Sequence, residues 1–359
     1  MADDKDQLTQ ALRPTEDLNV VSTVPLTPPG EVQEELPMTV EVNRVVIEGR
    51  ETIKRILSGQ DRRMLVVVGP CSIHDEDACM DYANRLAKLS KEVASKLFVV
   101  MRVYFEKPRT TVGWKGLIND PHLDGSFDME AGIRLARKLL LNVNRLGLPA
   151  GTEVLDPITP QYIADLVTWA AIGARTIESQ THRQMASGLS MPIGYKNATG
   201  GELQIAIDAM KSSGSAHSFL GIDDHGRTAL VKTRGNQAGH MILRGGRSGP
   251  NYSPANIQEA IEMLAKNKLT TRLMVDCSHA NSNKKYQNQE IVWREVIQQR
   301  IAGNQDLMGL LVESNINEGN QPMCADLSQL KYGVSITDEC LGWEKTEEMI
   351  RWAYEVLPA

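Results

Sequence analysis

Residues 64–71 read Met64-Leu-Val-Val-Val-Gly-Pro-Cys71, an apolar, β-branched run that ends at a glycine, a proline and a cysteine. A continuous apolar run of this length is typical of a strand that is buried on both faces of a parallel sheet. Seven further stretches are predicted as strands in the same way, at 98–103, 150–154, 174–178, 193–196, 241–244, 273–276 and 307–313. Helical stretches separate most of them, so the sequence predicts an α/β protein with a closed (β/α)8 TIM barrel.

The helices are predicted from periodicity and from their first residues. Apolar residues recur with helical spacing at 40–58 and at 129–147. Thr159-Pro160 and Ser253-Pro254 each have the form of an N-cap residue followed by proline at the first helical position. We therefore expect a helix to begin at each of these two prolines.

Three segments depart from a plain barrel. Residues 217–223 and 227–233 flank the turn Asp223-Asp-His-Gly226, which predicts a β-hairpin inserted between the fifth and sixth strands. The run 104–128 is too long for an ordinary barrel loop, and such long loops are usually functional. Residues 1–40 carry five prolines and cannot form a long helix. This N-terminal extension is either a disordered tail or an arm that docks on the barrel or on another subunit.

Length and composition limit the class of protein. The 359 residues suffice for two domains or for one barrel with extensions, and we predict an arm and helix at 1–60 followed by the barrel at 61–359, with the inserted hairpin at 217–233. The net charge of −6 argues against a nucleic-acid binder, and the apolar runs are too short to span a membrane. Five widely spaced cysteines and an acidic N-terminus without an apolar leader indicate a cytoplasmic protein with free thiols.

Charged residues end most of the predicted strands. In a barrel enzyme the carboxyl ends of the strands form one mouth, which carries the chemistry. A single charged strand end is usually a surface residue, but a whole set that converges on one mouth predicts an active site. The residues at or just after these ends are Cys71, Arg102, Glu153, Glu178, Lys196, Arg244, Asp276 and Glu313, and Arg175 lies inside the fourth stretch.

The mouth is expected to be strongly cationic. Arginine matches phosphate and carboxylate oxygens in a bidentate manner, and lysine acts as a point charge. So many cations imply a substrate with more than one anionic group, most simply phosphates and a carboxylate. The cations are Arg102, Lys107, Arg109, Arg175, Lys196 and Arg244.

A second set of residues has the chemistry of metal ligands. Cys71, His279, Glu313 and Asp338 offer sulfur, imidazole and carboxylate donors, which together suit a divalent transition metal. No Cys-x-x-Cys spacing supports such a site, and a lone cysteine after a strand is usually a small buried apolar residue. The metal hypothesis therefore depends on three of these residues lying at or near strand ends of the same edge.

Two other functions compete with a metal-dependent enzyme. Lys196 at a strand end is placed to form a Schiff base with a carbonyl substrate, with its pKa lowered by the neighbouring cations. That hypothesis predicts a lysine aldolase that acts on a phosphorylated sugar. The other alternative is a regulatory barrel that binds phosphate without catalysis.

Seven motifs around the mouth carry a resemblance to a known family. They read Val67-Val-Gly-Pro-Cys-Ser-Ile-His74, Met101-Arg-Val-Tyr-Phe-Glu-Lys-Pro-Arg-Thr-Thr-Val-Gly-Trp-Lys-Gly116, Gly173-Ala-Arg-Thr-Ile-Glu-Ser179, Ile242-Leu-Arg-Gly-Gly246, Val275-Asp-Cys-Ser-His-Ala-Asn281, Glu313-Ser-Asn and Ser335-Ile-Thr-Asp338. In order, from about residue 50 to the C-terminus, they resemble the 3-deoxy-D-arabino-heptulosonate-7-phosphate (DAHP) synthases of the microbial type I alpha class. Lys107-Pro-Arg-Thr110 distinguishes this family from the related 3-deoxy-octulosonate 8-phosphate synthases.

The resemblance implies both an activity and a metal site. The family condenses phosphoenolpyruvate with erythrose 4-phosphate and water in an aldol-type reaction, the first step of the shikimate pathway to chorismate and the aromatic amino acids. The resemblance places one divalent ion (Mn, Fe, Co or Zn), which acts as a Lewis acid, on Cys71, His279, Glu313 and Asp338.

The resemblance also assigns the substrate contacts. Arg175, Lys196 and Arg244 match residues around the phosphate of phosphoenolpyruvate, Arg102 and Lys107 match those at its carboxylate, and Arg109 and Thr110 match the erythrose 4-phosphate site. We expect Lys107 to protonate the new alkoxide and Glu153 to position the attacking water.

Feedback inhibition by an aromatic amino acid is implied as well. Phenylalanine-sensitive relatives tend to have serine where this chain has Gly221, and the missing side chain frees space for a phenolic oxygen, which predicts tyrosine as the inhibitor. The competing explanation is that a hairpin glycine serves only backbone geometry. Family members are dimers or tetramers in which the arm packs on a neighbouring subunit. We therefore expect a homo-oligomer, specifically a homotetramer. The positions that match the inhibitor cavity are Pro160, Gln161, Met185, Leu189, Ser190, Phe219, Gly221 and Val231.

Overall fold

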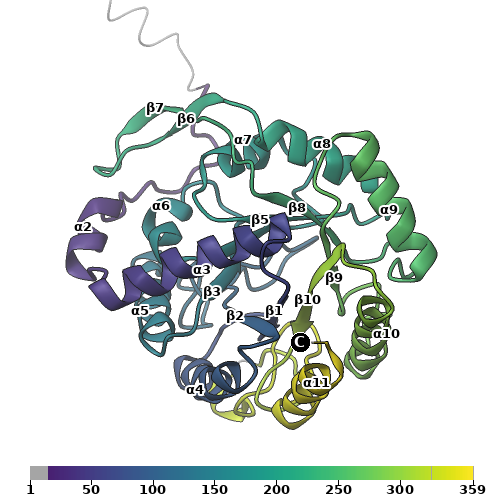
Figure 1. Ribbon diagram of the computed structural model, residues 1–359. Coiled ribbons are helices and arrows are strands. Elements are labelled where there is room, and N and C mark those ends of the chain that lie inside the picture. The colour runs from purple at the N-terminus through teal and green to yellow at the C-terminus, as the bar shows by residue number, and fades with distance from the viewer. Residues whose placement is uncertain (1–14, 325, 359) are drawn as a thin grey trace, which may run out of the picture.

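Eight parallel strands close into a barrel in a computed structural model of the protein, which describes residues 15–324 and 326–358. Around the barrel the strand order is β1-β10-β9-β8-β5-β4-β3-β2 (Figure 1). The predicted (β/α)8 TIM barrel is therefore confirmed. The strands are β1 (Met64–Gly69), β2 (Leu97–Arg102), β3 (Ala150–Glu153), β4 (Trp169–Ile172), β5 (Ile193–Lys196), β8 (Gly239–Leu243), β9 (Leu273–Asp276) and β10 (Leu307–Glu313).

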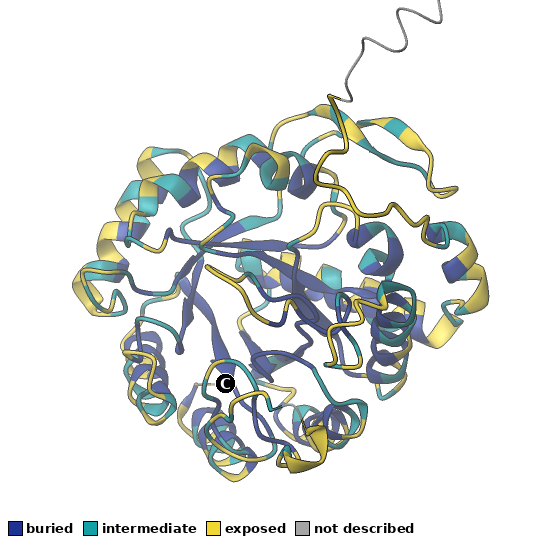
Figure 2. Ribbon diagram, turned by 180° about the vertical axis from the view of Figure 1, so that it is seen from behind, coloured by how far each residue is buried: buried dark blue, intermediate teal, exposed yellow. Residues whose placement is uncertain are grey.

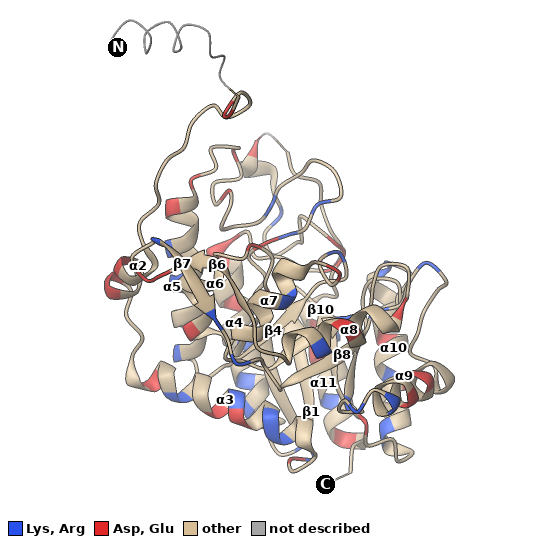
Figure 3. Ribbon diagram, turned by 90° about the horizontal axis from the view of Figure 1, so that it is seen from above, with Lys and Arg blue, Asp and Glu red and all other residues tan. Residues whose placement is uncertain are grey.

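The larger helices surround the barrel and carry its charged outer surface. Figure 3 shows both signs of charge on these helices, for example on α3 and α9. Three single turns of 3-10 helix lie at Ala164–Leu166, Tyr286–Asn288 and Leu327–Gln329. The α-helices are α2 (Pro29–Glu35), α3 (Val40–Ser58), α4 (Glu76–Glu92), α5 (Met129–Arg145), α6 (Pro160–Ile163), α7 (Gln180–Gly188), α8 (Leu203–Ser213), α9 (Pro254–Lys266), α10 (Gln289–Ile301) and α11 (Trp343–Val356).

The core is mostly aliphatic and has two parts. The larger part packs the strands against the surrounding helices, and the smaller part fills the inside of the barrel. In the smaller part, Ile53 and Ile56 of α3 pack with strand residues such as Val67, Trp169 and Met308. Helix α3 thereby closes the end of the barrel where the strands begin, and the carboxyl ends remain open. Figure 2 shows the buried strands at the centre and exposed residues on the outer helices and loops.

The predicted fourth strand is wrong in position. The strand is β4 at Trp169–Ile172, which pairs with β3 and β5, whereas 174–178 forms turns. The chain turns at Gly173, whose carbonyl accepts hydrogen bonds from the backbone N–H of Thr176 at 3.1 Å and from its hydroxyl at 3.2 Å. A strand of only four residues with two alanines has less β-branched character than the segment that follows it, which contains Thr176 and Ile177. Arg175 and Glu178 therefore lie in the loop after β4 and not on the strand.

One of the two predicted helix caps is also wrong. Ser253 accepts a hydrogen bond from the backbone N–H of Asn256 at 3.3 Å and caps α9, as expected. Thr159 makes no such bond and itself has helical dihedral angles. Its hydroxyl donates instead to the buried Glu106 carboxylate at 3.3 Å, which is a long-range contact that the sequence does not reveal.

The predicted hairpin is confirmed, and the described part of the arm docks on it. The hairpin comprises β6 (Ser218–Ile222) and β7 (Thr228–Lys232), and it lies between β5 and β8 in the chain. The backbone N–H of Gly30 donates to the Asp224 carbonyl at 2.8 Å, and the Tyr162 hydroxyl donates to the Thr27 carbonyl at 2.9 Å. The region from Thr27 to α2 thus packs on this chain's own barrel and hairpin. Residues 1–14 lie outside the described residues.

Between β2 and α5, residues 103–128 form the long loop that the sequence singles out, without helix or strand. It reaches the mouth through Lys107, Arg109 and Thr110. No helix among residues 15–324 and 326–358 is both long and apolar enough to cross a membrane.

Candidate active site

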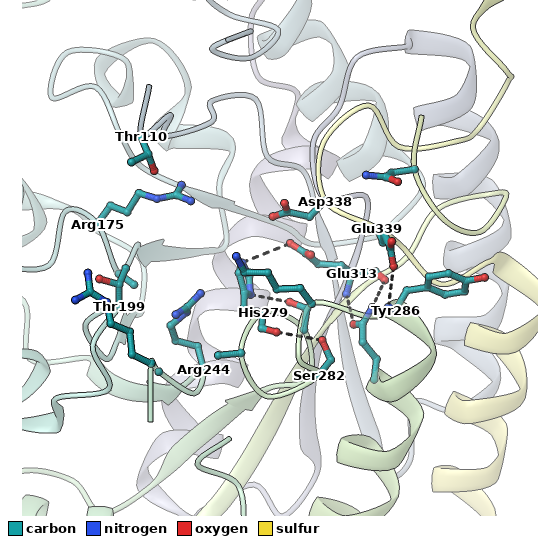
Figure 4. A pocket seen from close by; sticks show the side chains of 18 of the residues that line it. Thr110, Arg175, Thr199, Arg244, His279, Ser282, Tyr286, Glu313, Asp338 and Glu339 are labelled. Carbon is teal, nitrogen blue, oxygen red and sulfur yellow. Dashed lines mark hydrogen bonds and ion pairs between the residues drawn. The ribbon is translucent and has the colours of Figure 1, made fainter. Parts of the chain in front are cut away.

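Two adjoining cavities occupy the mouth, which is the opening at the carboxyl ends of the barrel strands. Their volumes are about 920 Å³ and about 270 Å³. They share the lining residues Thr110, Arg175, Arg244, His279 and Asp338, so they are compartments of one site. Figure 4 shows Arg175 and Arg244 on one side of the larger compartment and Glu313 and Asp338 on the other, with His279 between them.

The smaller compartment collects the cations that the strand ends predict. Each of them lines it, although they come from four different strands or the loops that follow them. A cavity of this size fits a compact anion. The residues in question are Arg102, Lys107, Arg109, Arg175, Lys196 and Arg244, together with Thr110 and Glu153.

Two of these cations are buried in ion pairs. Arg102 Nη2 lies 2.8 Å from Glu313 Oε1, and its guanidinium stacks 3.4 Å from the centre of the Tyr104 ring. Lys196 Nζ lies 3.3 Å from Glu153 Oε2 and 3.6 Å from Asp276 Oδ2. Such buried pairs hold both partners in fixed positions, because a lone buried charge is costly.

The pairing determines the charge state of Lys196. Burial by itself lowers the pKa of this lysine, but its acidic neighbours Tyr104, Glu153 and Asp276 outweigh burial and raise it. In the same way, burial raises the pKa of Glu153 and the charge of Lys196 more than reverses the effect, so the carboxyl remains ionised. The expected lowering of the lysine pKa by neighbouring cations is therefore wrong, because the nearest charges are acidic.

The other arginines are available to a ligand. No ion pair between described residues includes Arg109, Arg175 or Arg244. The Nε of Arg244 is buried without a hydrogen-bond partner, and burial lowers the pKa of this guanidinium. Arg175 Nη1 donates to the Pro108 carbonyl at 2.6 Å, which fixes it against the long loop. An anion between these side chains would supply the missing partners.

Three of the four expected metal ligands lie together. Donor atoms of Cys71, Glu313 and Asp338 are all within 4.8 Å of one another. Burial, and secondarily Glu313, raises the pKa of the Cys71 thiol to about 11, against the opposing charge of Lys107. Lys107 Nζ lies 3.0 Å from Cys71 Sγ. Sulfur and carboxylate donors in this arrangement fit a divalent transition metal.

The fourth expected ligand, His279, stands beside this group. Its Nε2 is 3.9 Å from Glu313 Oε1, and its Nδ1 is 2.9 Å from Asp276 Oδ2. A carboxylate on one imidazole nitrogen orients the other toward a metal in many metalloproteins. His279 also has a positive φ of 56°, a conformation that is costly for a residue with a side chain and is often found at functional sites.

Several residues of the site were given no functional role by the sequence. Asp276 holds both Lys196 and His279, and Tyr104 packs its ring against Arg102. Gln289 donates to the Glu313 carbonyl and accepts from the Glu313 N–H, both at 2.9 Å. Asp276 was visible as a charged strand end, whereas the other two carry no local signal.

The expected inhibitor positions fall into four places. Phe219 pairs with Val231 across the hairpin, and a Cβ at Gly221 would lie 2.8 Å from Val231 Cγ2. Leu189 and Ser190, just after α7, line a cavity of about 710 Å³ whose other walls come partly from α3 and α8. Met185 is buried on α7. Pro160 and Gln161 begin α6, and the Gln161 carbonyl accepts a hydrogen bond from Gln33 Nε2 of α2 at 2.9 Å.

A TIM barrel with a cationic mouth and a thiol–carboxylate group defines a class of phosphate-binding, metal-dependent barrel enzymes. The chain belongs to the DAHP synthetase I family, whose model matches residues 37–351. It is 52% identical over 332 residues to the Escherichia coli (strain K12) protein "Phospho-2-dehydro-3-deoxyheptonate aldolase, Tyr-sensitive", covering 92% of this chain and 93% of that protein.

Two further comparisons agree with this assignment. The Phe-sensitive protein of the same name from the same strain is 51% identical, covering 94% of this chain and 95% of the relative. A solved structure of phospho-2-dehydro-3-deoxyheptonate aldolase from Francisella tularensis SCHU S4 superposes with a TM-score of 0.92 at 46% identity, covering 94% of this chain and 98% of that one. The resemblance drawn from the sequence motifs is therefore confirmed.

Proposed function

We propose how the mouth carries out the reaction of the DAHP synthases. The activity is the condensation of phosphoenolpyruvate with erythrose 4-phosphate and water to DAHP and phosphate, under feedback control by an aromatic amino acid. One observation carries the assignment of the site: six cations from strand ends and loops line one compartment beside Cys71, Glu313 and Asp338.

The cations place the two substrates. Arg175, Lys196 and Arg244 hold the phosphate of phosphoenolpyruvate, and Arg102 and Lys107 hold its carboxylate. Arg109 and Thr110, at the outer end of the long loop, hold erythrose 4-phosphate. Because the two substrates repel each other, the neutralising positive charge and the fixed geometry are the main contributions of these residues to the rate.

The chemistry then follows from the groups that face the substrates. C3 of phosphoenolpyruvate attacks the aldehyde carbon, water adds at C2, and phosphate leaves by C–O cleavage. A divalent ion on Cys71, His279, Glu313 and Asp338 would polarise the aldehyde oxygen as a Lewis acid. Those donors fit Mn, Fe, Co or Zn.

Lys107 and Glu153 handle protons and water. Burial lowers the pKa of Lys107, but its neighbours Cys71 and Glu313 outweigh burial and raise it, so Nζ is protonated and able to donate to the new alkoxide. Glu153 is ionised and lies in the same compartment, so its carboxylate is able to accept a hydrogen bond from the attacking water.

A Schiff base on Lys196 is disfavoured by the same geometry. An amine nucleophile must lose its proton, whereas Glu153 and Asp276 stabilise the charged ammonium. Borohydride reduction in the presence of the substrates should therefore trap no covalent adduct.

The decisive experiment follows phosphoenolpyruvate consumption with erythrose 4-phosphate and Mn²⁺. We expect turnover that a chelator abolishes and that Mn²⁺ restores. Absence of turnover with Mn²⁺ would contradict the proposed site, and turnover that survives exhaustive chelation would contradict the metal ligands. The non-catalytic phosphate-binding alternative predicts ligand binding without turnover.

For regulation, we propose tyrosine as the inhibitor and the hairpin as part of its site. Identities of 52% and 51% to Tyr-sensitive and Phe-sensitive relatives do not discriminate between the two inhibitors, so the choice of tyrosine depends on Gly221. Its φ lies outside the positive region, so the backbone does not require glycine there. A Cβ at Gly221 would lie 2.8 Å from Val231 Cγ2, so glycine keeps this part of the hairpin face free of a side chain, and this is where we place the phenolic oxygen.

Gly221→Ser tests this proposal. A serine Cβ would crowd Val231, so the inhibition constant for tyrosine should rise severalfold while uninhibited activity is unchanged. Inhibition of the unaltered protein by phenylalanine but not by tyrosine would contradict the proposal.

We also propose that residues 1–60 form the arm and helix and that residues 61–359 form the barrel. We further propose that the enzyme is a homo-oligomer. If deletion of residues 1–14 leaves feedback inhibition unchanged, that segment is not part of the regulatory site.

A further inference from the structure

A second cation-rich cavity lies at the opposite end of the barrel from the mouth. Its volume is about 700 Å³, and we call it the basal cavity. It is lined from the segments just before β1, β2, β9 and β10, which are consecutive strands around the barrel. The charged residues that line it are Asp61, Arg62, Arg63, Lys96, Arg272 and Arg300.

The charges in the basal cavity are unbalanced. Asp61 is the single carboxylate among the described residues of the lining, and it is paired with Arg63 at 2.6 Å. No ion pair between described residues includes the other four cations, Arg62, Lys96, Arg272 and Arg300. Since the whole protein carries a net charge of −6, this local excess of positive charge is not a consequence of composition.

Backbone carbonyls hold the two inner arginines in place. Arg300 is 5% exposed and donates to the Gln305 carbonyl at 2.7 Å and to the Arg62 carbonyl at 3.0 Å. Arg272 donates to the Ile56 carbonyl at 3.1 Å. These bonds use only part of the five donors of each guanidinium and do not cancel its charge.

The surroundings do not neutralise this charge. Burial lowers the pKa of Arg300 and of Arg272, and the nearby Asp306 offsets only part of the effect. The C-terminal ends of α3, α4, α10 and α11 lie at this end of the barrel and attract cations, but each helix end carries only about half an elementary charge. Four cations without an ion pair among the described residues exceed what four helix ends balance.

We propose that the basal cavity binds a small molecule that carries two phosphate groups, at a site separate from the mouth. Arginine forks match phosphate oxygens, and four unpaired cations suit two dianionic groups. A volume of about 700 Å³ lies within the range of small-molecule sites and is far larger than one phosphate requires. No aromatic side chain lines the cavity to stack on a base, which favours a sugar-like bisphosphate over a nucleotide.

The test uses fructose 1,6-bisphosphate as the probe and isothermal titration of the full chain with its divalent ion. Because the mouth also attracts phosphates, the titrations are made on Arg175→Ala/Arg244→Ala, which weakens the mouth. We expect this protein to bind about one equivalent of the probe and to bind inorganic phosphate at least about tenfold more weakly. Absence of saturable binding, or equal affinity for phosphate, would overturn the proposal.

A second pair of substitutions locates the binding. Adding Arg62→Ala and Lys96→Met should weaken binding about tenfold, whereas adding Lys88→Ala and Lys266→Ala, which removes two exposed cations outside both cavities, should change it by less than about twofold. If the four substitutions together prevent folding, Arg62→Ala alone replaces the basal pair, since that side chain is exposed. Equal weakening by the basal pair and the control pair would overturn the assignment to the basal cavity.

Discussion

The two ends of this barrel are both rich in cations, but the cations at the two ends have different partners. At the mouth, Arg102 and Lys196 are buried against Glu313, Glu153 and Asp276. At the basal end, Arg272 and Arg300 are held by backbone carbonyls. Carboxylates set the charge state of their partners as well as their position, whereas carbonyls set the position alone. The mouth is therefore suited to proton transfer and bond formation, and the basal end is suited to binding an anion.

The largest expected difference between the two ends concerns the metal group. Cys71→Ala removes the sulfur ligand that lies beside Glu313 and Asp338 and that accepts a hydrogen bond from Lys107. We therefore expect kcat to fall by about 10³-fold or more in an assay of phosphoenolpyruvate consumption with Mn²⁺. Cys79→Ala, at a buried cysteine on α4, is the control and should retain activity. Comparable activity in both variants would show that the mouth does not work through this thiol.

The next prediction concerns the buried ion pairs. Lys196→Met leaves Glu153 and Asp276 without their shared cation, so the free energy of unfolding should fall by about 3–5 kcal/mol in chemical denaturation. Lys88→Met, at an exposed lysine, should change it by less than about 0.5 kcal/mol. A loss below about 1 kcal/mol for Lys196→Met would mean that the mouth is no more dependent on paired charge than the basal end.

Two buried carboxyls beside the mouth should respond to pH in opposite ways. Lys196 lowers the pKa of Glu153, whereas burial, with added repulsion from Asp156, raises the pKa of Glu106 to about 8. Between about pH 4.5 and 8 the folded state keeps a proton on Glu106 that the unfolded chain has lost, so Glu106 makes the protein less stable as pH rises through this window.

Glu106→Gln removes this dependence. Relative to the unaltered protein, the variant should gain about 3 kcal/mol in unfolding free energy between pH 5.5 and pH 8, measured by denaturant titration at both values. A difference between the two proteins that does not vary with pH would show that Glu106 is ionised in the folded state and has a cationic partner.

The smallest effect is expected at the basal rim. Arg62→Ala removes an exposed side chain that forms no ion pair with a described residue, so the unfolding free energy should change by less than about 0.5 kcal/mol. The Michaelis constants for both substrates should also be unchanged. An increase in either constant would link the two ends of the barrel and remove the distinction between them.

Much of the fold was predictable because its signals are local. Apolar runs such as Met64–Gly69 mark buried strands wherever they occur, and the turn at 223–226 marks the hairpin. The fourth strand was misplaced because its four residues Trp-Ala-Ala-Ile carry little β-branched character, while the following turn contains Thr-Ile. Thr159 does not cap its helix because its hydroxyl donates a hydrogen bond to Glu106, which is 53 residues away in the sequence.

The sequence by itself determined the barrel, the hairpin and the cations at the mouth, because strand periodicity and the end of each strand are properties of short segments. Only the tertiary structure decided which charges are paired. Arg102 and Glu313 are 211 residues apart, and Lys196 meets Glu153 and Asp276 from two other strands. The charge state of a buried group depends on its nearest neighbours in space. For that reason the sequence indicated a lysine with a lowered pKa, and the structure shows a raised one.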